Sequence, residues 1–524
     1  MAYATHQRAN RRTQPIGKAI AIAAAVSLVS GFGAGMGVTA LLKASPGSQQ
    51  SISATLNKTG GANTMSYDYT GTYSGALTAD GKKVTSDGET TTATETDQNA
   101  ALAQNGGTLT ITNGKFVKSG DSGNADNCNF YGTNSVLLAV GKQSKAVISG
   151  SSISAESAGS NGIFATDSAT VLANDVDIAT SAANSRGLDA TYGGSIIADG
   201  MTINTKGDHS ASLATDRGGG TVSVTGSTLS TAGSGSPLLY STGDIEVSGV
   251  TGTASGSQIA GMEGLNTILI NKSTLESTNT GTSGSDPVAN GVIIYQSTSG
   301  DADTATGEHA TFQAKDSTLK SAIESGSMFY FTNTTADVVL QNTELDFDSS
   351  AANLILAAGN DSNNWGSAGS NGATVTFTGR SQDLSGKVSA DTISTVTFNL
   401  LEGSSWTGSA EITQNSSASG SSSASEAPIS VNVDGTSTWV VTADTTISAL
   451  NVASGGKVVD SSGRTVTIKA DGKTVVSGDS DLTVTVTGSY GTSVSADSDT
   501  KLSSDVADRA AFDKQFGTDT AWSF

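Results

Sequence analysis

A motif of about 25 residues recurs along the middle of this chain and constrains its fold more than any other feature. In each copy, two apolar residues lie two positions apart and are followed by a small polar turn and one Leu, Ile or Phe. With that last residue as position zero, the other two fall at −7 and −5. The zero positions from Ile153 to Leu345 are spaced by 25, 25, 26, 21, 25, 44 and 26 residues. Such self-similarity indicates a repeat architecture.

Each copy of the motif predicts about three short strands. Asn, Asp and Gly are frequent in the turn between −5 and 0, and they tolerate positive φ, so the turn bends the chain without ending the pattern. Most copies also contain a second apolar run, such as residues 291–295. The apolar triplets are Leu109, Ile111, Phe116; Ala146, Ile148, Ile153; Val171, Ala173, Ile178; Ile196, Ala198, Ile203; Val222, Val224, Leu229; a shortened Ile245, Val247, Val250; Ile268, Ile270, Leu275; Phe312, Ala314, Leu319; and Val338, Leu340, Leu345.

A single copy cannot fold alone. Its three apolar sites contribute ~5 to 9 kcal/mol when buried, whereas ordering about 25 backbone residues costs ~25 to 50 kcal/mol. Stacked copies pair every strand with the coils above and below at ~4.8 Å and share one core. Parallel crossovers are right-handed. We therefore predict an all-β fold, a right-handed parallel β-helix (β-solenoid) with about 25 residues per coil.

Composition and charge exclude several classes of protein. Charged residues are 14% and aromatic residues 5%, which argues against a coiled coil or a helical bundle. Residues 1–44 hold five bases and no acid, so the rest of the chain carries 22 bases against 48 acids. A body this acidic repels phosphate backbones, and we expect no nucleic-acid partner. With one cysteine, Cys128, and three histidines, the chain lacks the ligands for a zinc finger or a His-rich metal site, and we predict no cofactor.

An uncharged apolar stretch occupies residues 19–42 and follows a basic, acid-free segment. As a helix its 24 residues span roughly 36 Å, enough to cross a hydrocarbon layer of ~30 Å. The basic flank stays in the cytoplasm, which places the rest of the chain outside. Two interpretations stay open: an uncleaved signal anchor, which gives a single-pass cell-surface protein, or a signal peptide cut after Ala40 or Ala44, which gives a secreted one.

The chain divides into six predicted segments. Residues 1–44 form the cytoplasmic tip and signal segment, 45–104 an exported linker with the first strands or a cap, and 105–410 the β-helix. Residues 411–428 form a Ser/Gly-rich loop and 429–500 the last coils. In residues 501–524 we expect a short amphipathic helix, with a Ser N-cap near Ser503, that covers an open end of the strand column.

Two stretches resemble known families. Residues 106–407 resemble pectate-lyase-like right-handed β-helices, on the repeat described above. From Trp406 onward, GSSWTGS and STWVVTADTTISALNVASGGKV around Trp439 resemble the C-terminal part of pertactin-like autotransporter passengers. The second resemblance implies that residues 429–500 form the last coils and stabilise the open end. Together the resemblances imply an adhesin-like surface protein.

The residues show no catalytic constellation. Polysaccharide lyases and hydrolases need clustered carboxylates and a base, whereas the acid pairs of this chain read as solvated turn or outer-face residues. Asp208, His209 and Ser210 have the residue types of a triad, but neighbouring strand residues face opposite sides. Cys128 reads as a packed thiol. The acid pairs are Asp175/Asp177, Asp301/Asp303 and Asp346/Asp348.

Four aromatic residues are the candidate ligand contacts. Tyr240, Tyr295 and Tyr330 recur at similar places in successive copies. An outward ladder of them would form a sugar-binding strip, whereas an inward one would be ordinary core stacking. Trp365, in the polar insertion GNDSNNWGSAGSNG, is the best candidate for an exposed contact.

Three hypotheses for function follow. The leading one is a bacterial cell-surface protein, adhesin-like, that displays loops 279–291, 298–310 and 359–373 toward a glycan or a host-surface protein. The second is a polysaccharide-binding or polysaccharide-cleaving β-helix. The third is a purely structural component of a surface layer.

Overall fold

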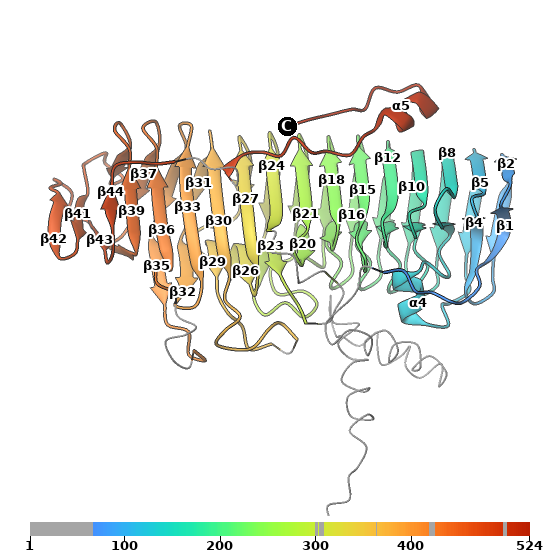
Figure 1. The fold of residues 1–524 in the computed structure, drawn as a ribbon, viewed down its shortest axis with the longest axis horizontal. Helices are drawn as coiled ribbons and strands as arrows, with labels where there is room; N and C mark the ends of the chain where they lie inside the picture. The colour runs from blue at the N-terminus through green and yellow to red at the C-terminus, as the bar shows by residue number, and fades with distance from the viewer. Residues whose placement is uncertain (1–65, 299–301, 303–308, 363, 419–424, 496–499) are drawn as a thin grey trace, which may run out of the picture.

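The chain forms a long rod of stacked β-strands. The computed structural model describes residues 66–298, 302, 309–362, 364–418, 425–495 and 500–524. Long parallel sheets run the length of the rod (Figure 1). This confirms the predicted all-β class and fits a β-solenoid. Neither helix of the described chain has the length and apolar character needed to cross a membrane. The predicted membrane segment 19–42 lies outside the described residues.

Three walls enclose the core, and the first is a sheet of 13 strands. Every ladder in it is parallel, and each strand pairs with the strand one coil away. We call it the first wall. Its strands are β1 (Ser74–Asp80), β4 (Gln98–Gln104), β7 (Leu137–Val140), β9 (Ile163–Thr166), β11 (Leu188–Ala190), β14 (Leu213–Thr215), β17 (Leu239–Ser241), β20 (Ala260–Glu263), β23 (Asn290–Tyr295), β26 (Ser327–Thr332), β29 (Asn353–Ala357), β32 (Val388–Asp391) and β35 (Ala410–Thr413).

The second wall follows the first after a turn in each coil. Two of its strands, β8 and β10, are 11 residues long and bend into the third wall, which joins the two walls in one sheet. Its strands are β2 (Lys83–Asp87), β5 (Thr108–Thr112), β8 (Lys145–Ala155), β10 (Thr170–Thr180), β12 (Gly194–Asp199), β15 (Gly220–Thr225), β18 (Asp244–Ser248), β21 (Thr267–Asn271), β24 (Ala310–Lys315), β27 (Thr335–Gln341), β30 (Thr374–Arg380), β33 (Thr395–Leu401), β36 (Ile429–Val433), β39 (Ala449–Val452) and β44 (Tyr490–Gly491).

The third wall is interrupted once along the rod. Its first part belongs to the sheet of the second wall and its second part is a separate four-stranded sheet. The first part holds β3 (Thr90–Ala93), β6 (Lys115–Lys118), the ends of β8 and β10, β13 (Thr202–Thr205), β16 (Thr228–Thr231), β19 (Thr251–Ala254), β22 (Thr274–Ser277), β25 (Thr318–Ser321) and β28 (Glu344–Asp346). The second part holds β31 (Asp383–Ser385), β34 (Ser405–Gly408), β37 (Thr438–Val441) and β40 (Lys457–Val459).

A last small sheet closes the C-terminal end of the rod. It contains the one antiparallel strand pair of the described chain, β41 with β42. A hairpin end of this kind stops parallel stacking, because no further coil can continue the parallel register. Its strands are β38 (Thr445–Ile447), β43 (Thr483–Val486), β41 (Thr467–Ala470) and β42 (Lys473–Val476).

Equivalent apolar residues of successive coils lie directly over one another. Val171 pairs with Ile196, and Ile196 pairs with Val222, each in register. One continuous cluster of buried side chains runs from Ala79 to Val486. The predicted shared core is therefore confirmed, and the side chains at −7, −5 and 0 supply much of it.

The corner between the second and third walls is built the same way in each coil. The residue at position −3 has positive φ, as in Asp175 (54°), Lys272 (46°) and Asn342 (47°). The corner N–H that follows often bonds to a serine hydroxyl of the next coil: the N–H of Met201 donates to Ser227 Oγ at 2.9 Å. A hydroxyl thus satisfies a buried N–H that the bend removes from the backbone ladder.

The shortened copy of the motif has a different register from the predicted one. Val250 was expected at position zero, but it lies at the corner, and Gly252 pairs with Leu229 and Leu275. A Cβ on Gly252 would approach Leu238 Cδ1 to 2.8 Å and Leu275 Cδ2 to 3.1 Å. The neighbouring leucines therefore fill the place where other coils have a side chain.

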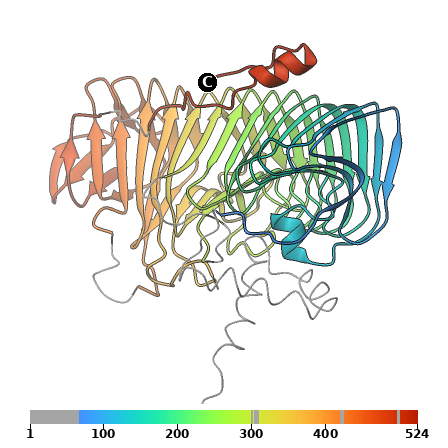
Figure 2. The same cartoon turned by 45° about the vertical axis from the view of Figure 1, so that its right-hand side comes forward.

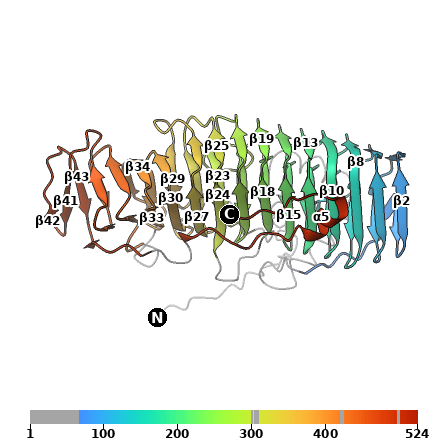
Figure 3. The ribbon, with the colours of Figure 1, turned by 90° about the horizontal axis from the view of Figure 1, so that it is seen from above.

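The C-terminal residues 500–524, here called the strap, lie along the outside of the second wall (Figures 1 and 3). The strap carries the helix α5 (Ala510–Phe516). Phe512 is buried against Leu172 of β10 and Ile197 of β12, nearer the N-terminal end of the rod than its middle. The predicted end-capping role was wrong, because Leu172 and Ile197 present an apolar contact on the outside of the second wall and the helix packs there instead. The Ser N-cap was also wrong, since Arg509 holds that position without a capping side chain.

Candidate functional site on the third wall

A row of threonines follows the outer face of the third wall. Parallel pairing sets them in register on five successive coils, so their spacing is ~4.8 Å. Four are exposed and the last is half-buried. Because strand residues alternate between faces, each threonine points outward while the next residue, such as Leu229 or Leu275, enters the core. We call this row the threonine ladder: Thr202, Thr228, Thr251, Thr274 and Thr318.

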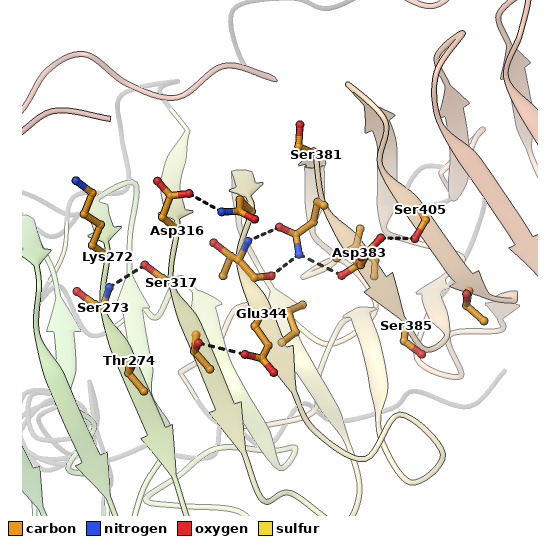
Figure 4. A pocket seen from close by; sticks show the side chains of 17 residues that line it. Lys272, Ser273, Thr274, Asp316, Ser317, Glu344, Ser381, Asp383, Ser385 and Ser405 are labelled. Carbon is orange, nitrogen blue, oxygen red and sulfur yellow. Dashed lines mark hydrogen bonds between the residues drawn. The ribbon is translucent and has the colours of Figure 1, made fainter.

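The threonine ladder leads into a groove of about 840 Å³ (Figure 4). The groove lies where the third wall is interrupted, between β28 and β31. Its walls are mostly hydroxyl, amide and carboxylate groups, with an apolar part that includes Leu345 and Leu384. The residues that line it are Lys272, Ser273, Thr274, Asp316, Ser317, Thr318, Asn342, Thr343, Glu344, Leu345, Ser381, Gln382, Asp383, Leu384, Ser385, Ser405 and Thr407.

One glutamine bridges the interruption that opens the groove. In the coils before it, the N–H of Ser273 donates to Ser317 Oγ at 3.1 Å. In the next coil, Gln382 replaces the serine. The N–H of Thr343 donates to Gln382 Oε1 at 2.8 Å, and Gln382 Nε2 donates to the carbonyl of Thr343. The longer side chain keeps both buried backbone groups bonded although β28 and β31 form no ladder in the described chain.

The three carboxylates of the groove are held separately. Asp316 accepts from Asn342 Nδ2 at 2.7 Å, Glu344 from Thr318 Oγ1 at 3.4 Å, and Asp383 from Ser405 Oγ at 2.6 Å. No three acidic, histidine or cysteine side chains in the described parts of the chain converge enough to hold a metal ion. The site offers many hydrogen-bonding groups along a line, which suits recognition of an extended hydroxylated ligand better than chemistry at one point.

The four aromatic residues predicted as ligand contacts are buried. Trp365 is 2% exposed and stacks on Tyr295, with 4.1 Å between ring centroids and 9° between planes. Tyr330 belongs to the same cluster, which lies outside the central core. The prediction of an exposed Trp365 was therefore wrong. Nor do these rings stack in the core: Tyr240, Tyr295 and Tyr330 belong to small clusters outside it.

The insertion around Trp365 folds back on the rod instead of extending away. Asn371 Nδ2 donates to the carbonyls of Trp365 and Asn360 at 2.9 and 2.8 Å. In loop 279–291, Asp286 is buried, accepts from Asn290 Nδ2 at 2.9 Å, and has its pKa raised to about 7 by burial. Asn290 and Tyr295 both belong to β23, so the Asp286 bond and the Trp365–Tyr295 stack hold the two loops against the first wall. Loop 298–310 lies mostly outside the described residues.

A buried charge cluster on the outer side of the first wall was missed at the sequence level. Arg186 donates to Asp216 Oδ2 and to Asn129 Oδ1, each at 2.9 Å, and its Nη1 lies 3.4 Å from Asp189 Oδ2. Burial raises the pKa of Asp189 well above its usual range, although Arg186 opposes this. Asn129 belongs to the helix α4 (Ala125–Phe130), which covers the cluster. The sequence signal for this cluster was Asp189, a charged residue that lies between the apolar residues Leu188 and Ala190.

The remaining sequence candidates stay apart from the groove. Cys128 is fully buried, and burial raises its pKa to about 12. Burial also lowers the pKa of His209 to about 4. Asp175 and Asp177 are exposed, as are Asp346 and Asp348, in agreement with their assignment to the outer face. Asp301 and Asp303 lie outside the described residues.

Comparison of the chain with protein-family models, with curated proteins and with solved structures finds no match.

Proposed function

We propose that this chain is a bacterial cell-surface protein, adhesin-like, whose rod binds a repeating polymer along its third wall. The observation that carries the proposal is the threonine ladder continuing into the polar groove. Hydroxyl groups at a regular spacing match a partner that also repeats, such as a glycan chain or a repetitive host-surface protein. A compact ligand would use only a small part of this surface.

The continuous core supports binding along the rod. Residues from Ala79 to Val486 share one cluster, so the positions of successive outer residues are set by the coil spacing. A preformed array does not have to be ordered when the polymer binds, and the entropic cost of association falls accordingly. The polymer then gains many weak contacts whose sum grows with its length.

Placement outside the cell rests on residues 19–42. In this proposal they anchor the chain in a single membrane, or are removed on secretion, and the acidic body lies outside.

The right-handed sense of the coils and the relation to pectate-lyase-like and pertactin-like proteins belong to the same proposal. In its support, Trp406 and Trp439 are buried and stacked at 4.7 Å, and each indole N–H bonds to a glycine carbonyl of the preceding coil.

A polysaccharide-cleaving role is the weaker alternative. The groove holds three carboxylates and Lys272, but each carboxylate is bonded to a different neighbour. Catalysis of glycoside cleavage needs two carboxyl groups that flank one bond, about 5 to 10 Å apart. The arrangement favours binding over cleavage.

The test is binding of residues 45–524, which retain the whole core, to a glycan array and to purified cell-wall and mucin polymers. The matched variants are T228V/T251V/T274V on the threonine ladder and T221V/T267V/T311V on the second wall. Valine keeps the strand preference of threonine and removes only the hydroxyl. We expect the first triple variant to lose at least tenfold in affinity and the second to bind normally.

Two results would overturn the proposal. If both triple variants bind the polymer equally, the ladder is not the contact. If no glycan or host polymer binds and no acidic polysaccharide is cleaved, the structural surface-layer role becomes the better explanation.

A further inference from the structure

A second cavity lies at the N-terminal end of the rod, away from the threonine ladder. Its volume is about 620 Å³, within the range of small-molecule sites. The segment before β1, with Tyr67 and Tyr73, forms one side, and the turns that follow β4, β7 and β9 form the other. The residues that line it are Tyr67, Gly71, Thr72, Tyr73, Gln104, Asn105, Gly106, Val140, Gly141, Lys142 and Asp167.

Two of the lining residues, Tyr67 and Tyr73, belong to a cluster of five tyrosines that packs behind the cavity wall. Tyr131 and Tyr192 stack at 5.5 Å with 3° between their planes, and Tyr67 meets both rings edge-on at 5.6 and 5.5 Å. Tyr69 stacks on Tyr131 at 5.0 Å and lies 5.0 Å from Tyr73. The segment that precedes β1 runs across the first coils beside α4 (Figure 2), and Phe130 of α4 belongs to the same cluster. Half of the ten tyrosines of the chain meet here.

Several polar groups of the cavity offer hydrogen-bond acceptors to a ligand. Tyr73 donates its proton to the carbonyl of Tyr131 at 3.0 Å, so the contact of 2.8 Å between the two phenols is donated by Tyr67. Both phenol oxygens therefore keep only acceptor capacity for a ligand. Asn105 Nδ2 donates one of its two protons to Asp80 at 2.7 Å, which leaves its amide oxygen as an acceptor and its second N–H as a donor for a ligand.

Asp167 is the carboxylate of the cavity. It is half-buried, has φ of 51°, and burial raises its pKa. No hydrogen bond or ion pair to it is present within the described residues. A partly desolvated acceptor of this kind gains from a ligand that supplies donors. Lys142 adds one donor to the same cavity.

From this geometry we infer that the tyrosine cavity binds an uncharged sugar ring. A sugar supplies several hydroxyl donors to the acceptors of Asp167, Tyr67 and Asn105, and its apolar C–H face packs against an aromatic wall. The acidic body of the chain disfavours an anionic ligand. This site is independent of the threonine ladder, so either one can fail without the other.

The experiment uses the full-length chain in mild detergent. Saturation-transfer difference NMR, with irradiation of the tyrosine protons, probes the methyl glycosides of glucose, galactose, N-acetylglucosamine and N-acetylgalactosamine, with galacturonic acid as the anionic probe. We expect transfer to ring protons of at least one neutral sugar. D167N should weaken its binding at least tenfold, and Y67F about threefold.

D175N is the matched control, because Asp175 is also an aspartate at positive φ, 54°, but lies at an exposed corner outside the cavity. Asparagine tolerates this conformation, so both variants are expected to fold. Equal thermal unfolding curves for D167N and D175N check this. Binding of galacturonic acid alone, binding of no neutral sugar, or equal loss in D167N and D175N would each overturn the inference.

Discussion

The outer faces of the second and third walls differ although the same coils build both. The middle outward row of the second wall contains buried apolar side chains among polar ones, and the strap covers two of them, Leu172 and Ile197. The outward row of the third wall is polar, with threonine on five successive coils, and those coils stay open. The difference teaches that an outward strand position does not imply a free surface. An apolar outward row needs a cover, and a hydroxyl row is stable in water.

The strap is held by polar contacts as well as by Phe512. Arg509 donates to the carbonyls of Ser223 and Ala198 at 3.1 and 2.8 Å. The N–H of Ala507 donates to the carboxylate of Glu246 at 2.8 and 3.0 Å. Further along, Gln313 bonds to the strap backbone at Lys501 and Ser503. At its start, Arg380 of β30 donates to the carbonyl of Thr500, so the strap crosses the second wall from β30 to β10.

The largest expected effect comes from F512A. Removing a buried aromatic ring costs about 3 kcal/mol. We expect this cost to weaken the docking of the strap and to leave the folding of the rod unchanged. Hydrogen exchange should become roughly a hundredfold faster in residues 500–524. The control F516A, at a half-buried ring of the same helix, should have a smaller effect. Equal acceleration throughout the rod would contradict the assignment of the strap as a separate unit.

Attachment of the strap should weaken as the pH rises. Burial, together with the charges of Glu246 and Asp505, raises the pKa of Asp244 to about 8. An acid with a raised pKa in the docked state keeps its proton there and loses it when the strap leaves. Docking is therefore strongest near pH 4 and falls by up to about tenfold per pH unit toward pH 8. D244N should flatten this dependence, measured by exchange in residues 500–524, and an unchanged slope would contradict it.

On the third wall, Q382A should cost about 2 kcal/mol, because it leaves the buried N–H and carbonyl of Thr343 without their partner. The effect should be local, seen as faster exchange in β28 and β31. Q382N, one methylene shorter, tests the reach of the bridge and should recover less than half of the loss. Full protection in Q382A would show that the glutamine does not hold the two parts of the wall together.

The smallest change in stability is expected on the threonine ladder. T228V, T251V and T274V should each change the free energy of unfolding by less than about 0.5 kcal/mol, since the side chains are exposed and the strand preference is kept. Thermal unfolding measures this. The contrast with F512A sharpens the comparison of the two walls: one outer face contributes to stability and the other is available for a partner.

Several features of the site could not be predicted from the sequence because they depend on distant segments. Trp365 lies in a polar insertion, and only folding of that insertion onto Tyr295 buries it. Gln382 looks like an ordinary polar residue until the separation of β28 and β31 gives it two backbone partners. The five tyrosines of the N-terminal cavity are spread over residues 67–192, and no local pattern joins them.

By itself, the sequence determined the coil. Side chains alternate between the two faces of a strand, so the apolar residues at −7, −5 and 0 specify which side chains enter the core. The chain bends at −3, where Asn, Asp, Gly or Lys adopts positive φ. Both properties are local to the coil. The tertiary structure alone decided what lies over each outer face. An outward leucine such as Leu172 requires a cover, but only the path of the strap, more than 300 residues later, identifies it.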